Sequence, residues 1–179
     1  AGASVRRNPN DVRRVLGFMP DVFGVYDDMK VWEYLDFFAR CYGIAADRRR
    51  RMIGDLLELV DLGSKRDMYV QGLSRGMQQR LCLAHTLVHD PQVLFLDEPT
   101  ANLDPASTQD IERIIQAIHA SGTKIIMTTH NLGQARRLGD EILFISNGRL
   151  MEHTPIDRFF KEPVSSEAAA FIKGELPWH

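Results

Sequence analysis

The stretch that most constrains this chain is the apolar run Val93–Leu96, which Asp97 and Glu98 follow directly. Four consecutive apolar residues between polar ones predict a short strand that is buried on both faces, as in a parallel sheet. Pro99 then prevents the strand from continuing. In open α/β sheets ligands bind beyond the carboxyl ends of the strands, so the two carboxylates stand where a site is expected. A lone Asp-Glu pair is more commonly a polar turn, and the functional interpretation therefore depends on the other motifs.

Strand and helix patterns alternate on both sides of this run. Apolar and β-branched stretches predict strands over 15–19, 124–129 and 142–146, and Asn147-Gly148 predicts a hairpin turn. Helical spacing and start signals predict helices over 31–42, 47–60, 74–89, 105–120 and 131–138. This order predicts an α/β domain with a parallel sheet core, and the almost entirely helical stretch 24–88 interrupts it as a subdomain.

Composition excludes several classes of protein. The 179 residues, of which 44% are hydrophobic, are enough for one globular domain with a sizeable core. The net charge of -2 gives no basic field for nucleic acid or anionic lipid. No apolar stretch approaches the ~20 residues that are needed to cross a bilayer.

Four motifs occur in a fixed order along the chain. They are Leu73-Ser74-Arg75-Gly76-Met77 with Gln78-Gln79-Arg80, Leu94-Phe95-Leu96-Asp97-Glu98-Pro99, Asn102-Leu103-Asp104 and Thr128-Thr129-His130. In this order and spacing they resemble the ATP-binding cassette (ABC) ATPases. Residues 15–42 and 140–151 are also similar to that family, and more narrowly to the ATPase subunits of bacterial exporters.

The resemblance implies a P-loop NTPase-type, RecA-like parallel sheet core with an inserted α-helical subdomain. On this basis, 1–23 would be a remnant of the N-terminal part of the sheet core with the Q-loop region, and 24–88 would be the helical subdomain, ending in the signature helix. Residues 89–154 are the RecA-like core with the Walker B, D-loop and H-loop motifs, and 155–179 form a C-terminal tail.

Three residues receive roles in ATP hydrolysis from the resemblance. Asp97 would hold Mg²⁺, through water, because Mg²⁺ dehydrates reluctantly. Glu98 would orient or deprotonate the attacking water. His130 would donate a hydrogen bond to the γ-phosphate of ATP.

A second group of residues is expected to contact the nucleotide or the seam between two ATPase domains. Backbone N–H groups at a helix start bind phosphate, and in this family that start contacts the ATP of the opposite subunit. Two ATP molecules would thus lie between two copies. Three positions depart from the family pattern, because Arg75 replaces a glycine and Met77 and Asp21 replace glutamines. The group comprises Ser74, Arg75, Gly76, Met77, Asp104 and Asp21.

The chain contains no P-loop, because none of its thirteen glycines precedes a lysine. The family places that loop upstream of the motifs found here. We therefore expect an N-terminally truncated cassette whose own ATP site is incomplete.

The resemblance also implies partners and a location. We expect a transmembrane permease subunit, a homodimer or heterodimer of ATPase domains, no nucleic acid, and a position at the cytoplasmic face of the plasma membrane. Phe23, Val25 and Tyr26, with the helix from Val31, would form the groove for the permease. Two alternatives stay open: a non-transport cassette ATPase of DNA maintenance or translation, and a non-catalytic interaction module.

Overall fold

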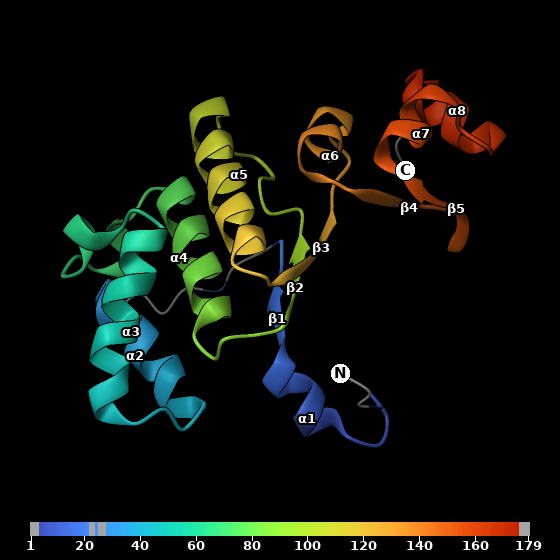
Figure 1. Cartoon of the computed structure of the whole chain (residues 1–179). Coiled ribbons are helices and arrows are strands. Elements are labelled where there is room, and N and C mark those ends of the chain that lie inside the picture. Colours follow the sequence, from blue (N-terminus) through green and yellow to red (C-terminus); the bar gives the residue numbers. More distant parts are fainter. Residues whose placement is uncertain (1–3, 22–23, 25–27, 176–179) are drawn as a thin grey trace. The chain divides into compact units, whose positions relative to one another are not determined.

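The computed structural model describes residues 4–21, 24 and 28–175. The chain divides into two compact units, Ala1–Thr128 and Thr129–His179, and each is described here by itself (Figure 1). Phe23, Val25 and Tyr26, which were expected to form the permease groove, lie outside the described residues.

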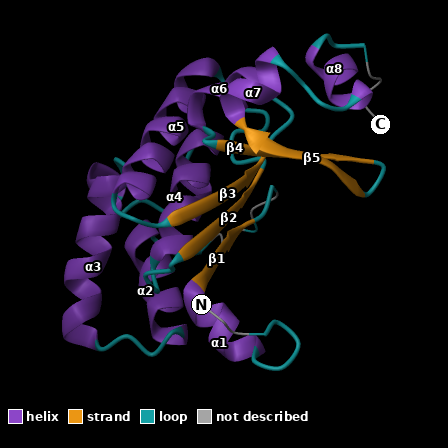
Figure 2. Ribbon diagram, turned by 45° about the vertical axis from the view of Figure 1, so that its right-hand side comes forward, coloured by secondary structure: helices purple, strands orange, loops and turns teal. Residues whose placement is uncertain are grey.

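Three parallel strands form the sheet of the first unit, in the order β1-β2-β3 (Figure 2). They are β1 (Leu16–Met19), β2 (Val93–Asp97) and β3 (Lys124–Thr128). In register, Met19 lies beside Leu96, and Asp97 lies beside Thr128. The three strands therefore end at one edge of the sheet, and the residues that follow them begin at that edge.

Helices make up most of the rest of the first unit. Three of them begin or end where the sequence provides a signal: Ser74 caps the start of one, Pro105 stands at the first position of another, and Gly43, with φ of +71°, follows the end of a third. They are α1 (Pro9–Val15), α2 (Val31–Cys41), α3 (Ala46–Leu59), α4 (Arg75–Leu87) and α5 (Pro105–Ala120), with 3-10 turns at Gly63–Lys65 and Val70–Gly72.

The sheet is more deeply buried on the face that these helices cover. Leu94 and Leu96 are buried, whereas Phe95 is half-buried and its neighbour Phe18 is 55% exposed. Successive side chains of a strand point to opposite faces, so these values separate the two faces. Figure 2 shows α4 and α5 on one side of the strands. The prediction that the β2 run is buried on both faces is therefore wrong for the described residues, because helices of this unit cover one face.

Helix α4 packs tightly against the sheet at Gly17. A Cβ atom at this position would lie 2.8 Å from the carbonyl oxygen of Thr86 and 2.8 Å from Cδ1 of Leu94. Glycine is thus required for the close contact between β1 and α4.

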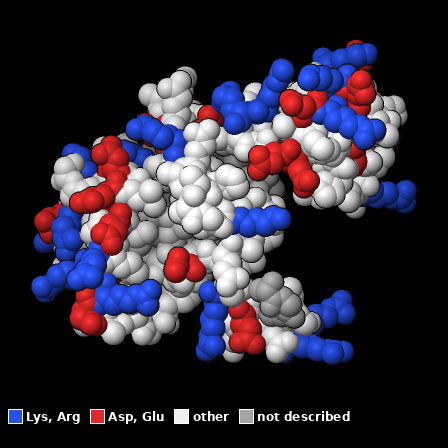
Figure 3. All heavy atoms as spheres, in the orientation of Figure 1, with Lys and Arg blue, Asp and Glu red and all other residues white. Residues whose placement is uncertain are grey.

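Charged residues of both signs lie together on the helices. On the face drawn in Figure 3, Lys and Arg atoms alternate with Asp and Glu atoms over the helical part. Asp36 on α2 accepts two hydrogen bonds at 2.6 Å, one from Arg40 of the same helix and a partly buried one from Arg49 on α3. Arg49, within the basic run 48–51, thereby joins two helices.

The second unit contains helices around a two-stranded hairpin. Its elements are α6 (Leu132–Leu138), β4 (Glu141–Ser146), β5 (Arg149–Pro155), α7 (Ile156–Lys161) and α8 (Ser166–Ile172). Asn147 and Gly148 both have positive φ and form the predicted turn. Phe144, Phe159 and Ala168 form the buried core of this unit.

The predicted α/β class with a parallel sheet core is confirmed. Within the described part of the chain, no helix combines the length and the apolar character that a bilayer span requires.

Candidate functional site

The end of β2 brings Asp97 and Glu98 into contact with one threonine of β3. The hydroxyl of Thr128 donates to Oδ1 of Asp97 at 2.6 Å. The backbone N–H of Glu98 donates to the hydroxyl oxygen of Thr128 at 3.1 Å and to its carbonyl oxygen at 3.3 Å. Glu98 has a φ of +46°, so the chain turns sharply as it leaves the strand. The Asp97 carboxylate and the Glu98 backbone are thus fixed at the carboxyl edge of the sheet.

The start of α4 has the geometry that the sequence predicts. The side chain of Ser74 accepts a hydrogen bond from the backbone N–H of Met77 at 3.3 Å and caps the helix. Ser74 and Arg75 are exposed, Met77 is half-buried and Gly76 is buried. The helix start is therefore accessible at Ser74 and Arg75 and is held to its own unit at Gly76.

Asp104 caps α5 in the same way. Its Oδ1 accepts hydrogen bonds from the backbone N–H groups of Ala106 and Ser107, each at 3.0 Å, and its Oδ2 accepts one from the Ser107 hydroxyl at 2.6 Å. The Ser107 hydroxyl, followed by the backbone donors, holds the pKa of Asp104 below its ordinary value. Asp104 is consequently a carboxylate at neutral pH.

The starts of α4 and α5 lie side by side. A Cβ atom at Gly76 would lie 2.6 Å from Oγ and 3.0 Å from Cβ of Ser107. Ser107 also holds Asp104, so the predicted phosphate-binding turn and the predicted seam residue meet at one serine. Sequence reasoning missed Ser107 because nothing in its local pattern indicates a contact with residue 76.

A buried glutamine joins α4 to the loop after β2. Nε2 of Gln79 donates to the carbonyl oxygen of Pro99 at 3.0 Å. Sequence reasoning gave Gln79 and Thr128 no role, although both stand inside the quoted motifs.

The remaining two predicted site residues are less closely defined. Asp21 is exposed and follows the end of β1 by two residues, so it starts from the same edge of the sheet as Asp97. His130 belongs to the second unit, and its place at this edge stays a prediction.

The residues at the carboxyl edge of the sheet are suitable ligands for a hard divalent cation whose other ligands are water and substrate phosphates. Asp97 and Thr128 offer carboxylate and hydroxyl oxygens, which suit Mg²⁺. No group of three or more His, Cys, Asp or Glu residues within 4–21, 24 and 28–175 forms a metal cage. Mg²⁺ commonly binds through one or two carboxylates plus water and substrate phosphates, so this donor set is sufficient.

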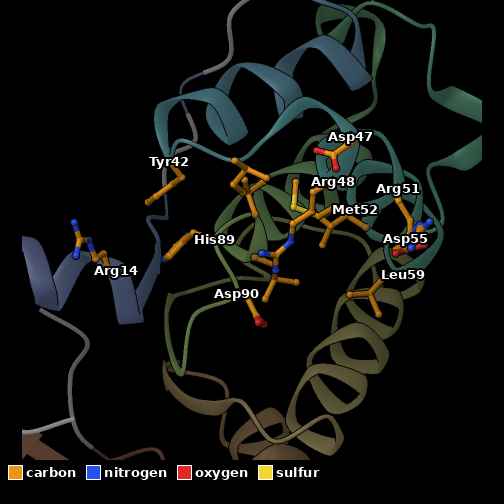
Figure 4. Close-up of a pocket in the computed structure, with 14 residues that line it drawn as sticks. Arg14, Tyr42, Asp47, Arg48, Arg51, Met52, Asp55, Leu59, His89 and Asp90 are labelled. Atoms are coloured by element: carbon orange, nitrogen blue, oxygen red, sulfur yellow. The ribbon is translucent and has the colours of Figure 1, made fainter.

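A hollow of about 840 Å³ lies at the other end of α4 (Figure 4). The rings of Tyr42 and His89 stack at 4.2 Å on one side, and Leu59 lies on another. Three arginines and three aspartates line the hollow, so their formal charges cancel. The thirteen residues of α4 span about 20 Å at ~1.5 Å each, which separates this hollow from Ser74. The hollow is therefore not part of the candidate site at the carboxyl edge of the sheet.

Comparisons with known proteins show what this chain is similar to. A family model described as "AAA domain, putative AbiEii toxin, Type IV TA system" matches residues 6–133. The Nod factor export ATP-binding protein I of Ralstonia nicotianae is 38% identical over 98% of this chain and 55% of its own length. The phosphate import ATP-binding protein PstB 2 of Natronomonas pharaonis is 36% identical over 72% of this chain and 45% of its own length.

A solved structure, described as the ATP binding subunit of an ABC transporter, has the same fold. Its TM-score is 0.78 at 23% identity, over 96% of this chain and 73% of that one. The chain spans about half the length of the curated relatives it matches. The matched AAA domain and these relatives identify the family: the chain belongs to the AAA-domain family, among the ATP-binding subunits of ABC transporters.

Proposed function

We propose that this chain is the ATP-hydrolysing part of an ABC transporter subunit that drives export through a separate membrane subunit. One observation carries the proposal: Thr128 fixes Asp97 and Glu98 together at the edge of the sheet where ligands bind. The family binds ATP, and the acidic pair offers a ligand for the cation and a base for the water.

Asp97 and Glu98 have different roles in ATP hydrolysis. Asp97 holds Mg²⁺, whose charge offsets that of the transferred phosphoryl group. Glu98 orients the attacking water and accepts its proton. Phosphoryl transfer is mainly a matter of positioning and charge neutralisation, and these two carboxylates supply part of both. Asp21 approaches the same cation and water, and His130 donates to the γ-phosphate.

The active unit is a dimer, either of two copies or of this chain with a related ATPase domain. The exposed start of α4 at Ser74 and Arg75 faces the phosphates of the ATP held by the opposite subunit, with Gly76 and Met77 in the same turn. Backbone N–H groups and the helix dipole favour negative charge there. Asp104 lies at the seam between the two domains.

The membrane subunit places the chain at the cytoplasmic face of the plasma membrane. Export is the proposed direction, because the Nod factor export relative matches 98% of the chain at 38% identity, whereas the phosphate import relative matches 72%. Mass spectrometry of cells that carry Glu98→Gln tests the direction. A compound that accumulates inside those cells supports export, and one that becomes depleted inside them contradicts it.

The enzymatic proposal is tested by Glu98→Gln in the complete native protein, assembled with its membrane partner. Steady-state ATP hydrolysis should fall by roughly 10²–10⁴-fold, because glutamine cannot accept the proton. ATP binding should persist in the same variant. Exposed Glu58 on α3 gives the matched control, and Glu58→Gln should hydrolyse ATP at the normal rate.

Two results would contradict the proposal. If Glu98→Gln hydrolyses ATP normally, Glu98 has no catalytic role. If the native assembly never hydrolyses ATP at all, the chain is a non-catalytic module.

A further inference from the structure

Gln79 is a buried glutamine on the second turn of α4, with only 7% of its surface exposed. Its carboxamide donates to the Pro99 carbonyl oxygen, which directly follows Glu98 in the chain. Buried polar groups in folded proteins are almost always hydrogen-bonded, so this contact fixes both the glutamine and the loop. It joins two segments that are twenty residues apart.

The backbone at Glu98 needs such a restraint. Its φ of +46° is in the left-handed region, which residues with a Cβ atom rarely occupy. Thr128 holds the residue on its N–H side, at 3.1 and 3.3 Å. Gln79 holds the carbonyl group of the next residue, Pro99. Strained conformations persist only where the surroundings determine them from several sides, and here the restraints come from β3 and from α4.

We propose that Gln79 is a positioning residue for ATP hydrolysis: it holds the Glu98–Pro99 turn so that the Glu98 carboxylate keeps its direction toward the attacking water. Because the same helix begins at Ser74, hydrolysis then depends on where α4 lies. A movement of α4 toward nucleotide is transmitted through Gln79 to Glu98. This inference rests on the proposed function of Glu98.

The test uses two variants in the complete native protein with its membrane partner. Gln79→Leu removes the donor at similar size, and Gln79→Glu keeps the length but, when ionised at high pH, presents only acceptors to the Pro99 carbonyl. For either variant that folds, kcat should fall ~10–100-fold, since small displacements of a catalytic group have effects of this size. The KM for ATP should stay near the wild-type value, because Gln79 is buried within its own unit.

Gln78 provides a matched control. It is the preceding residue of the same helix and donates to the carbonyl oxygen of Val70 at 3.4 Å, away from the Glu98 turn. Gln78→Leu should keep a normal kcat. If Gln78→Leu and Gln79→Leu lose kcat equally, Gln79 contributes only to folding and the proposal is wrong.

Hydrogen exchange gives a readout that does not depend on turnover. The backbone N–H of Ala101 donates to the Glu98 carbonyl oxygen at 3.0 Å within the same turn. Its exchange should accelerate in Gln79→Leu and stay normal in Gln78→Leu. In a Glu98→Gln background, Gln79→Leu should cause no additional loss of the residual rate, because residues that act as a unit are not additive.

Failure of this inference is distinguishable from failure of the proposed function. Normal kcat and normal Ala101 exchange in both Gln79 variants overturn the positioning role and leave Glu98 as the base. A native assembly in which wild type and variants alike hydrolyse no ATP overturns both.

Discussion

At the scale of single residues, the Thr128 hydroxyl defines the geometry of the acidic pair. It donates its proton to Asp97 and accepts one from the Glu98 backbone, so its donor and one acceptor position are both used. Asp97 is thereby held in one orientation while the next residue turns away from the strand. The register of β2 and β3 makes these hydrogen bonds possible, because Thr128 lies directly beside Asp97 in this pair of parallel strands.

His85 carries a prediction at the same scale. The ring of Phe38 lies 3.8 Å from its ring, and its Nδ1 atom has no hydrogen-bond partner among the described residues. Burial, with a smaller contribution from His89, lowers the pKa of His85 from 6.5 to about 4. The folded protein therefore keeps this histidine neutral across that range.

The free energy of unfolding should decrease as the pH falls from 6.5 to 4. Within that window the unfolded chain binds a proton at His85 and the folded chain does not, so acid favours unfolding, by on the order of 3 kcal/mol in total. Denaturant titrations at several pH values measure the slope. The neutral variant His85→Gln should show a shallower slope, and an unchanged slope would rule out His85 as its source.

At the scale of secondary-structure elements, the parallel starts of α4 and α5 are the central contact. Ser74 caps one helix and Asp104 caps the other, and Gly76 allows the two first turns to touch at Ser107. Gln79 then ties α4 to the loop that leads into α5. The start of α4, proposed to bind phosphate, and the loop after β2, which contains Glu98, therefore pack together within the first unit.

Gly76→Ala should separate these two helix starts. The added Cβ atom would lie 2.6 Å from Oγ of Ser107, closer than packed atoms allow. Overpacking of this kind costs about 1–3 kcal/mol of the free energy of unfolding. Thermal or chemical denaturation measures the loss.

The double variant Gly76→Ala/Ser107→Gly provides the control. It removes the atoms that the new methyl group would meet. Its loss in free energy of unfolding should therefore be smaller than the sum of the losses in the two single variants. Strict additivity would show that the two positions are not in contact.

At the scale of the whole chain, the two compact units contain different parts of the predicted machinery. The first holds Asp97, Glu98, the start of α4 and Asp104, and the second holds His130. Residues 1–179 contain no Gly-Lys-Ser/Thr loop, which in P-loop proteins supplies the amides and the lysine that bind the phosphates.

Residues 1–179 on their own should thus bind MgATP weakly, with a Kd above ~1 mM. Isothermal titration calorimetry measures it, with circular dichroism as the control for folding. A micromolar Kd would contradict this prediction.

The sequence by itself determined the local elements and the family. Apolar spacing located the strands and helices, Ser74 and Asn147-Gly148 marked a cap and a turn, and the order of the motifs identified ABC-type ATPases. These features can be predicted from the sequence because each depends on residues that are only a few positions apart.

Only the tertiary structure decided the contacts that position the site. Thr128 with Asp97, Gln79 with Pro99 and Ser107 with Gly76 join residues that are 20 to 31 positions apart. Such contacts depend on strand register and on how closely helices pack, and the local pattern of a sequence specifies neither. The same is true of the half-buried Phe95, because the apolar run alone cannot tell which faces of a strand are covered.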